Sequence, residues 1–315
     1  MKNFDLNKFI IIAFFYISCK SSVPIIDIGN INHDGDINDI DNWLTELSLK
    51  NYFNGAILIS VNRKVELMNT YGYSNLARTK PLTAQSSFRL ASVSKQFTAT
   101  AIMILKERGK LSYDDNVKSY LVDFPYEDVT IRHLLTHTSG IPDYESLVLK
   151  FKNKSSTKYF YRTGQSKENI VYKGDPSLYK NQHDILSMKD VLDLVIRYSD
   201  KRKFLAGDKY KYSNTGYVLL AYIVEKISEQ TFESFMDDHI FTPLEMKNSS
   251  VWNLNTSSGK LDNRVECTNK NRLNDYTWMD GVAGDGAVFV GAAAAAMSVP
   301  APPPAAELVL SAAAV

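Results

Sequence analysis

The segment that most constrains this chain is Phe88–Phe97, FRLASVSKQF, where a turn opens into an apolar helix. Apolar side chains recur at helical spacing behind this turn and predict a helix that packs on a core: Phe97, Ala101, Ile104 and Leu105. The spacing places Ser92 on the first helical turn and Lys95 on the same face. A hydroxyl at a helix N-terminus lies where the backbone dipole favours negative charge, and a nearby amine can take its proton if burial or a neighbouring cation lowers the amine's pKa. The pattern indicates a serine nucleophile with a lysine base.

The composition is that of a globular protein. The chain has 315 residues, of which 44% are hydrophobic and 23% charged, with a formal net charge of +1. A chain of this length can bury a large core in one domain or in two interleaved ones. The near-neutral balance gives no indication of a nucleic-acid partner. Cys19 and Cys267 are the only cysteines, and H-E-x-x-H, P-loop and G-x-G-x-x-G motifs are absent, so we expect no metal and no cofactor.

The N-terminus has the pattern of an export signal. Residues 9–18, FIIIAFFYIS, form an apolar run that is too short to span a bilayer comfortably but is typical of a signal-peptide core. The run ends directly before Cys19 in a sequence similar to the cleavage box of bacterial lipoproteins, although Tyr16 replaces the usual leucine. We expect a lipoprotein-type signal peptide over 1–19, a lipid anchor on Cys19, a tether over 20–36 and a periplasmic or cell-envelope location. The alternative is an ordinary exported signal with an incidental cysteine.

Residues 37–290 are predicted to form one folded body that mixes helices and strands. Apolar runs bounded by turn residues predict strands over 55–61 and 65–73. Helical spacing and capping residues predict the helices, which lie around 40–47, from Ser92 to a cap at Gly109, over 130–136, over 187–198, and after Gly216.

Two histidines, His133 and His137, are spaced four residues apart, as metal ligands on one helix face can be. No third ligand stands near them in the sequence. We therefore expect these histidines to make structural hydrogen bonds.

Four segments resemble consecutive landmarks of one family: Ala91–Lys95 (ASVSK), Leu134–Gly140 (LLTHTSG), Tyr212–Tyr217 (YSNTGY) and Phe241–Met246 (FTPLEM). The chain resembles the serine β-lactamase and penicillin-binding-protein superfamily, in its class C-like branch of β-lactamases, DD-peptidases and related esterases. S-x-x-K and Y-x-N triplets recur elsewhere in the chain, but only Ser92 and Tyr212 stand directly before an apolar helix. Two positions depart from the family pattern, with Ala206 at a usual proline and Glu245 at a usual glycine.

The resemblance implies an α/β (α+β) fold of the β-lactamase/transpeptidase type. An antiparallel sheet flanked by helices would adjoin a mostly helical domain, with the site between them. By the same resemblance Ser92 is the acylated nucleophile and Lys95 its base. Tyr212 would be a partner in proton transfer, and Asn214 a donor to Lys95 and to the substrate amide.

The function that the resemblance implies is a β-lactamase-related serine hydrolase that forms an acyl-enzyme. Its small-molecule or peptide substrate would be a β-lactam, a D-amino-acid peptide or a small ester, and we expect a monomer. The alternative is a non-catalytic, penicillin-binding-like scaffold that binds cell-wall peptide.

The C-terminal part departs from the family. No K-T-G or H-x-G triplet follows Tyr212, although this motif supplies the family's second oxyanion donor, whose loss typically costs about 100- to 1000-fold in turnover. Its absence favours the non-catalytic alternative. Residues 291–315 hold 11 alanines, as many as the preceding 290 residues, which indicates an anomalous tail, a reading-frame error or placeholder residues. We expect the hydrolase domain to be incomplete at its C-terminus and the tail to have no fold.

Overall fold

The computed structural model describes residues 37–61, 64–75, 77–148, 186–252 and 263–266, together with the backbone of four short strands beyond them. The expected signal peptide, the tether and the anchor residue Cys19 lie outside this range. Within it, no helix combines the length and the apolar character needed to cross a membrane.

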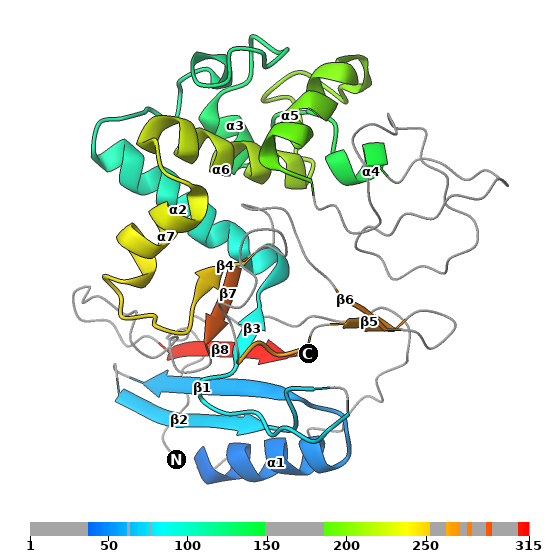
Figure 1. The fold of residues 1–315 in the computed structure, drawn as a ribbon, viewed down its shortest axis with the longest axis vertical. Helices are drawn as coiled ribbons and strands as arrows, with labels where there is room; N and C mark the ends of the chain where they lie inside the picture. Colours follow the sequence, from blue (N-terminus) through cyan, green and yellow to red (C-terminus); the bar gives the residue numbers. More distant parts are fainter. Residues whose placement is uncertain are drawn as a thin grey trace, which may run out of the picture.

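Seven α-helices lie in the described ranges: α1 (Ile37–Leu49), α2 (Ser94–Glu107), α3 (Ile131–Leu135), α4 (Tyr144–Val148), α5 (Met188–Arg197), α6 (Asn214–Ser228) and α7 (Phe232–Met236). Short 3₁₀ turns connect them: η3 (Ala91–Val93), η4 (Val117–Ser119) and η6 (Ser199–Lys201), with one π turn, η7 (Asp237–Phe241). Figure 1 shows α3, α5 and α6 at one end of the molecule and α1 at the other, with α2 between them.

The strands in the described ranges are β1 (Gly55–Val61), β2 (Lys64–Tyr71), β3 (Ser87–Arg89), β4 (Ser250–Val251), β5 (Thr268–Lys270), β6 (Tyr276–Trp278), β7 (Val288–Gly291) and β8 (Leu308–Ala314). They form three antiparallel groups with the orders β2-β1-β8, β3-β7-β4 and β5-β6. Helix α1 lies along the first group, on the side of β2 (Figure 1). The mixture of antiparallel sheet and helices confirms the predicted fold class.

The strand β8 comes from the tail for which the sequence predicted no fold. Its backbone pairs with β1 in a continuous antiparallel register, from Gly55 opposite Ala314 to Val61 opposite Leu308. Alanine has a low strand propensity, so the composition of this segment gave no strand signal. The pairing uses main-chain groups along the open side of β1, which any extended segment can satisfy.

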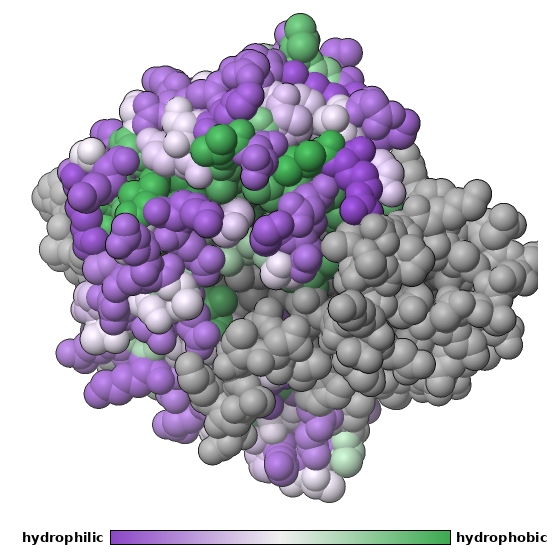
Figure 2. Space-filling view, turned by 45° about the horizontal axis from the view of Figure 1, so that its top comes forward, coloured by the Kyte–Doolittle hydropathy of each residue, from purple (hydrophilic) through white to green (hydrophobic). Residues whose placement is uncertain are grey.

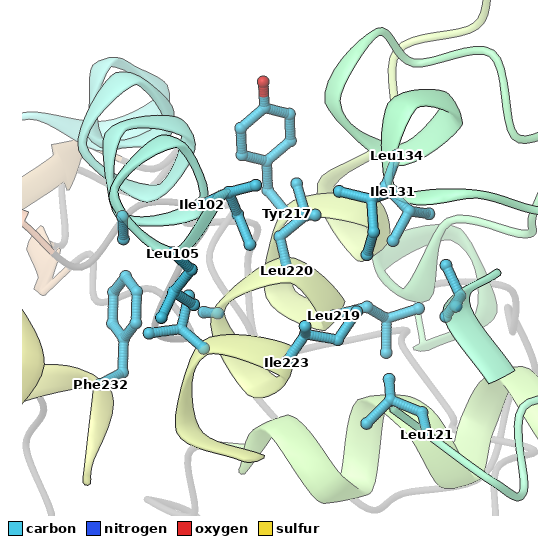
Figure 3. Close-up of a cluster of buried hydrophobic side chains, with 14 of the residues drawn as sticks. Ile102, Leu105, Leu121, Ile131, Leu134, Tyr217, Leu219, Leu220, Ile223 and Phe232 are labelled. Carbon is cyan, nitrogen blue, oxygen red and sulfur yellow. The ribbon is translucent and has the colours of Figure 1, made fainter. Parts of the chain in front are cut away.

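The main core lies between the helices, and α6 is its centre. Helix α6 is apolar around nearly its whole circumference, because α2, α3, α5 and α7 all contact it. Figure 3 shows side chains from these elements converging, among them Ile102 of α2, Leu134 of α3 and Leu220 of α6. The face of the molecule seen in Figure 2 is mostly hydrophilic, with apolar residues visible in gaps between the polar ones. Of the four apolar positions predicted to pack α2 on a core, Ala101 and Leu105 are buried, whereas Phe97 and Ile104 are partly buried at its edge.

Local capping chemistry sets the helix boundaries as the sequence predicted. Thr130 caps α3 and Ser187 caps α5, each in a capping box with the residue three positions later. Helix α2 ends before Gly109, whose φ of +67° is the left-handed conformation that closes many helices.

Candidate active site

Ser92 lies on a tight turn rather than on the first turn of the long helix. Strand β3 ends at Arg89, and Ala91 follows in a left-handed conformation with φ +47°. Ala91–Val93 then form the 3₁₀ turn η3, and α2 begins only at Ser94. This corrects the predicted helix start by two residues, because the left-handed Ala91 prevents a regular α-helix there. The turn leaves Ser92 exposed, just before the N-terminus of α2.

Lys95 connects the site residues. Its side chain is buried, with 6% of its surface exposed. The Lys95 Nζ lies 3.4 Å from the Ser92 Oγ and donates to the Asn214 Oδ1 at 2.8 Å. A proton transfer between the Ser92 hydroxyl and the amine therefore needs only a small approach. The resemblance implied that Asn214 donates to Lys95, whereas in the structure the Lys95 Nζ donates and the Asn214 Oδ1 accepts.

Two aromatic rings flank the same amine. The Lys95 Nζ lies 5.1 Å from the ring centroid of Tyr212 and 5.7 Å from that of Tyr217, within the range of a cation–π contact. Tyr212 is 43% exposed, which makes it the more exposed of the two tyrosines. The Tyr217 hydroxyl donates to the Leu135 carbonyl at 3.0 Å, and its ring stands at the edge of the core (Figure 3).

The N-terminus of α6 positions Tyr212 and Asn214. The Ser213 side chain caps the helix by accepting the Gly216 N–H at 3.4 Å. The Asn214 N–H donates to the Asp143 carboxylate at 2.7 Å, and the Thr215 hydroxyl accepts the Tyr144 N–H at 2.7 Å. The segment before α4 thus holds the first turn of α6, and through it the Asn214 side chain that binds Lys95.

Both histidines of the i,i+4 pair make hydrogen bonds, as the sequence predicted. The His133 Nδ1 accepts the Thr130 N–H at 3.2 Å in the α3 capping box, and the His137 Nδ1 accepts the Ser213 N–H at 3.2 Å. Burial, and after it the positive charge of Lys95, lowers the pKa of His137 below its ordinary value. Within the described residues, no group of three His, Cys, Asp or Glu side chains is placed to hold a metal ion.

The structure brings all four predicted site residues together and adds three that the motifs did not single out for the site. These are His137, Asp143 and Tyr217. His137 and Tyr217 belong to the segments that carried the resemblance, so their position could have suggested a role. Asp143 follows Gly140-Ile141-Pro142 in a loop, and only the fold reveals that it faces α6.

The site combines a hydroxyl, an amine that can exchange its proton, a phenol and an amide. These groups are what an acyl transfer needs for nucleophilic attack and protonation of the leaving group. The segment in which the family's third motif would be sought lies largely outside the described residues.

Comparison with known proteins shows which family and which relatives this chain resembles. Residues 41–314 match the family model described as "Beta-lactamase". Penicillin-binding protein 4* of Bacillus subtilis is 33% identical over 255 residues, which cover 77% of this chain and 50% of the relative. The chain thus spans about half the length of that relative. The matched range includes most of the alanine-rich tail.

Solved structures share the fold. An octameric penicillin-binding protein homologue from Pyrococcus abyssi matches with a TM-score of 0.63 and 24% identity, over 84% of this chain and 55% of that one. A class C β-lactamase matches with a TM-score of 0.57 and 20% identity, over 80% and 60% of the two chains.

Proposed function

Because the chain belongs to the β-lactamase family, we propose that it is a serine hydrolase that forms an acyl-enzyme on Ser92. The observation that carries this proposal is the position of the Lys95 Nζ between the Ser92 Oγ and the Asn214 Oδ1, with the Tyr212 ring beside it. The substrate is a β-lactam, a D-amino-acid peptide or a small ester.

The proposed chemistry is an acylation of Ser92, which includes loss of the leaving group, followed by hydrolysis of the acyl-serine. Lys95 takes the hydroxyl proton while the Ser92 Oγ bonds to the substrate carbonyl carbon, and the backbone N–H of Ser92 is one oxyanion donor. The bond to the leaving group then breaks, and the proton passes to that group through Lys95 and Tyr212. Water next attacks the acyl-serine ester, which releases the acid and restores the Ser92 hydroxyl.

The second candidate function is a non-catalytic scaffold that binds cell-wall peptide. The observation that favours it is the lack of a K-T-G or H-x-G triplet after Tyr212. Such a protein would bind the peptide without forming a lasting bond to Ser92.

Covalent labelling distinguishes the two functions. The intact protein is incubated with a fluorescent penicillin and, in parallel, with a fluorophosphonate, and the adduct is located by peptide mass spectrometry. We expect the label on Ser92, and we expect Ser92→Ala to abolish it. Ser94→Ala is the matched control, because Ser94 lies two residues away and is fully buried. A lack of adduct on folded protein would rule out the hydrolase, and loss of labelling only in Ser94→Ala would reassign the nucleophile.

Substrate class is assigned by a parallel assay. A chromogenic cephalosporin, a D-Ala-D-Ala peptide and a nitrophenyl ester are compared by kcat/KM. The homologue from Pyrococcus abyssi is described as octameric, so our expectation of a monomer has no support from the comparisons, and light scattering coupled to gel filtration tests it.

We also propose that the protein is an exported lipoprotein of the cell envelope, anchored through Cys19. The support is the apolar run that ends directly before Cys19. Expression in a bacterium fed an alkyne-bearing fatty acid should label the protein. Cys19→Ser should remove the label, and Cys267→Ser, the other cysteine, should retain it. Equal labelling of both variants would contradict the proposed anchor.

A further inference from the structure

His137 contacts the chain on both sides of Tyr212. Its Nδ1 accepts the Ser213 N–H at 3.2 Å, and its carbonyl oxygen accepts the Lys211 N–H at 2.8 Å. Its ring lies against the Tyr212 ring, with 4.5 Å between the centroids and 34° between the planes. One residue therefore holds both neighbours of Tyr212 and packs on its ring.

The backbone of His137 is shaped for this contact. His137 adopts the left-handed conformation, with φ +59°, directly after α3. This conformation is uncommon for residues other than glycine, although histidine and asparagine enter it several-fold more often than most. Backbone strain of this kind persists only where surrounding contacts fix it. Here the Lys211 and Ser213 amides supply such contacts.

We propose that His137 is a positioning residue for Tyr212, and that it acts only while its ring is neutral. This inference rests on the proposed function, since it assigns a role within the same acyl transfer. The Ser213 N–H can donate only to an unprotonated Nδ1, so the ring proton must be on Nε2. A second proton would replace that acceptor with a donor and release the segment that carries Tyr212.

The groups around the ring favour its neutral form. Lys95 approaches from α2, Tyr210 and Tyr212 from the loop before α6, and Tyr217 from α6. None of these side chains is a carboxylate, and Lys95 can carry a positive charge. Burial and Lys95 lower the pKa of His137. Neutral His137 therefore predominates at pH 7, and protonation at lower pH gives the acylation rate an acid limb.

Two substitutions separate the hydrogen bond from the ring contact. His137→Asn places an amide oxygen near the position of Nδ1, tolerates a positive φ and does not titrate. His137→Phe keeps a ring against Tyr212 but has no acceptor. We expect His137→Phe to slow acylation by fluorescent penicillin or by fluorophosphonate about tenfold, as for a lost hydrogen bond. We expect His137→Asn to lose less and to lack the acid limb that the wild type shows below about pH 6.5.

A double-mutant cycle shows whether His137 acts through Tyr212. Tyr212→Phe alone should slow turnover about 100-fold, as for a lost proton-transfer group. If His137 acts by positioning the phenol, His137→Phe should cost almost nothing further in the Tyr212→Phe background. An equal tenfold loss in both backgrounds would overturn the inference, and so would an acid limb that persists in His137→Asn. Thermal unfolding of each variant confirms that it is folded.

A measurement independent of activity separates failure of this inference from failure of the proposed function. The amide ¹⁵N resonance of Ser213 should shift as His137 titrates in the wild type and stay constant in His137→Asn. If the wild type reacts with neither probe while this shift is present, the hydrolase proposal fails, but the inference that His137 positions Tyr212 stands. If the shift is absent, the inference fails whatever the activity.

Discussion

Glu245 stands where the family usually has glycine, and its backbone has the conformation that glycine favours. Its φ is +53°, and its side chain is exposed after the π turn η7. A left-handed conformation costs most residues roughly 1–2 kcal/mol. We expect Glu245→Gly to be more stable than Glu245→Ala by about 1 kcal/mol, because both remove the same side chain but only alanine keeps the strain. Chemical denaturation checks this difference, and equal stabilities would mean that the turn is not strained.

Ala206 is the other departure from the family pattern, and its contacts show how the fold uses it. The Ala206 N–H donates to the Asp128 carboxylate at 3.0 Å, a bond that a proline could not make. The same carboxylate pairs with Arg202, and chiefly this hydrogen-bonded guanidinium lowers the pKa of Asp128 to about 2. The loop that leads to Tyr212 is thus held by a backbone donor and an ion pair in place of a proline.

At the scale of elements, the first turn of α6 depends on a hydrogen bond from a distant segment. The Thr215 hydroxyl is buried and accepts the Tyr144 N–H at 2.7 Å. Thr215→Val keeps the shape but removes this acceptor, which typically costs about 1–3 kcal/mol at a buried position. Thr215→Ser keeps the hydroxyl and serves as the control. We expect urea unfolding to show the larger loss in Thr215→Val, and a larger loss in Thr215→Ser would show that the methyl group matters more.

Most of the helices and the first two strands could be predicted from the sequence, whereas the later strands and the contacts between elements could not. Thr130 and Ser187 predict where their helices begin, because a capping box involves residues only three positions apart. Ser92, Lys95, Tyr212 and Asn214 were predicted from motifs, and the fold places them together. The bond from Asn214 to Asp143 joins residues 71 positions apart, so no local pattern reports it. Strand β8 was missed for a similar reason, since its partner β1 lies near the other end of the chain.

At the scale of the whole molecule, His137 links stability to pH. Its pKa is lowered in the folded protein, so the folded state binds the proton less readily than the unfolded chain, whose histidine has a pKa of about 6.5. The resulting stabilisation is complete above about pH 6.5 and declines as the pH falls towards the lowered value. We expect the urea concentration at the unfolding midpoint to decrease as the pH is lowered from 7 to 5. In His137→Asn this decline should be smaller, and an unchanged decline would show that other groups cause it.

The site residues are attached to the most deeply buried helix of the described structure. Tyr212 and Asn214 depend on α6, and Lys95 depends on α2, which packs along it. The buried faces of these helices become exposed only when the core opens. Heating should therefore not produce a population that is folded but no longer reacts at Ser92. The temperature at which the proposed acylation of Ser92 stops should coincide with the temperature at which the fold is lost.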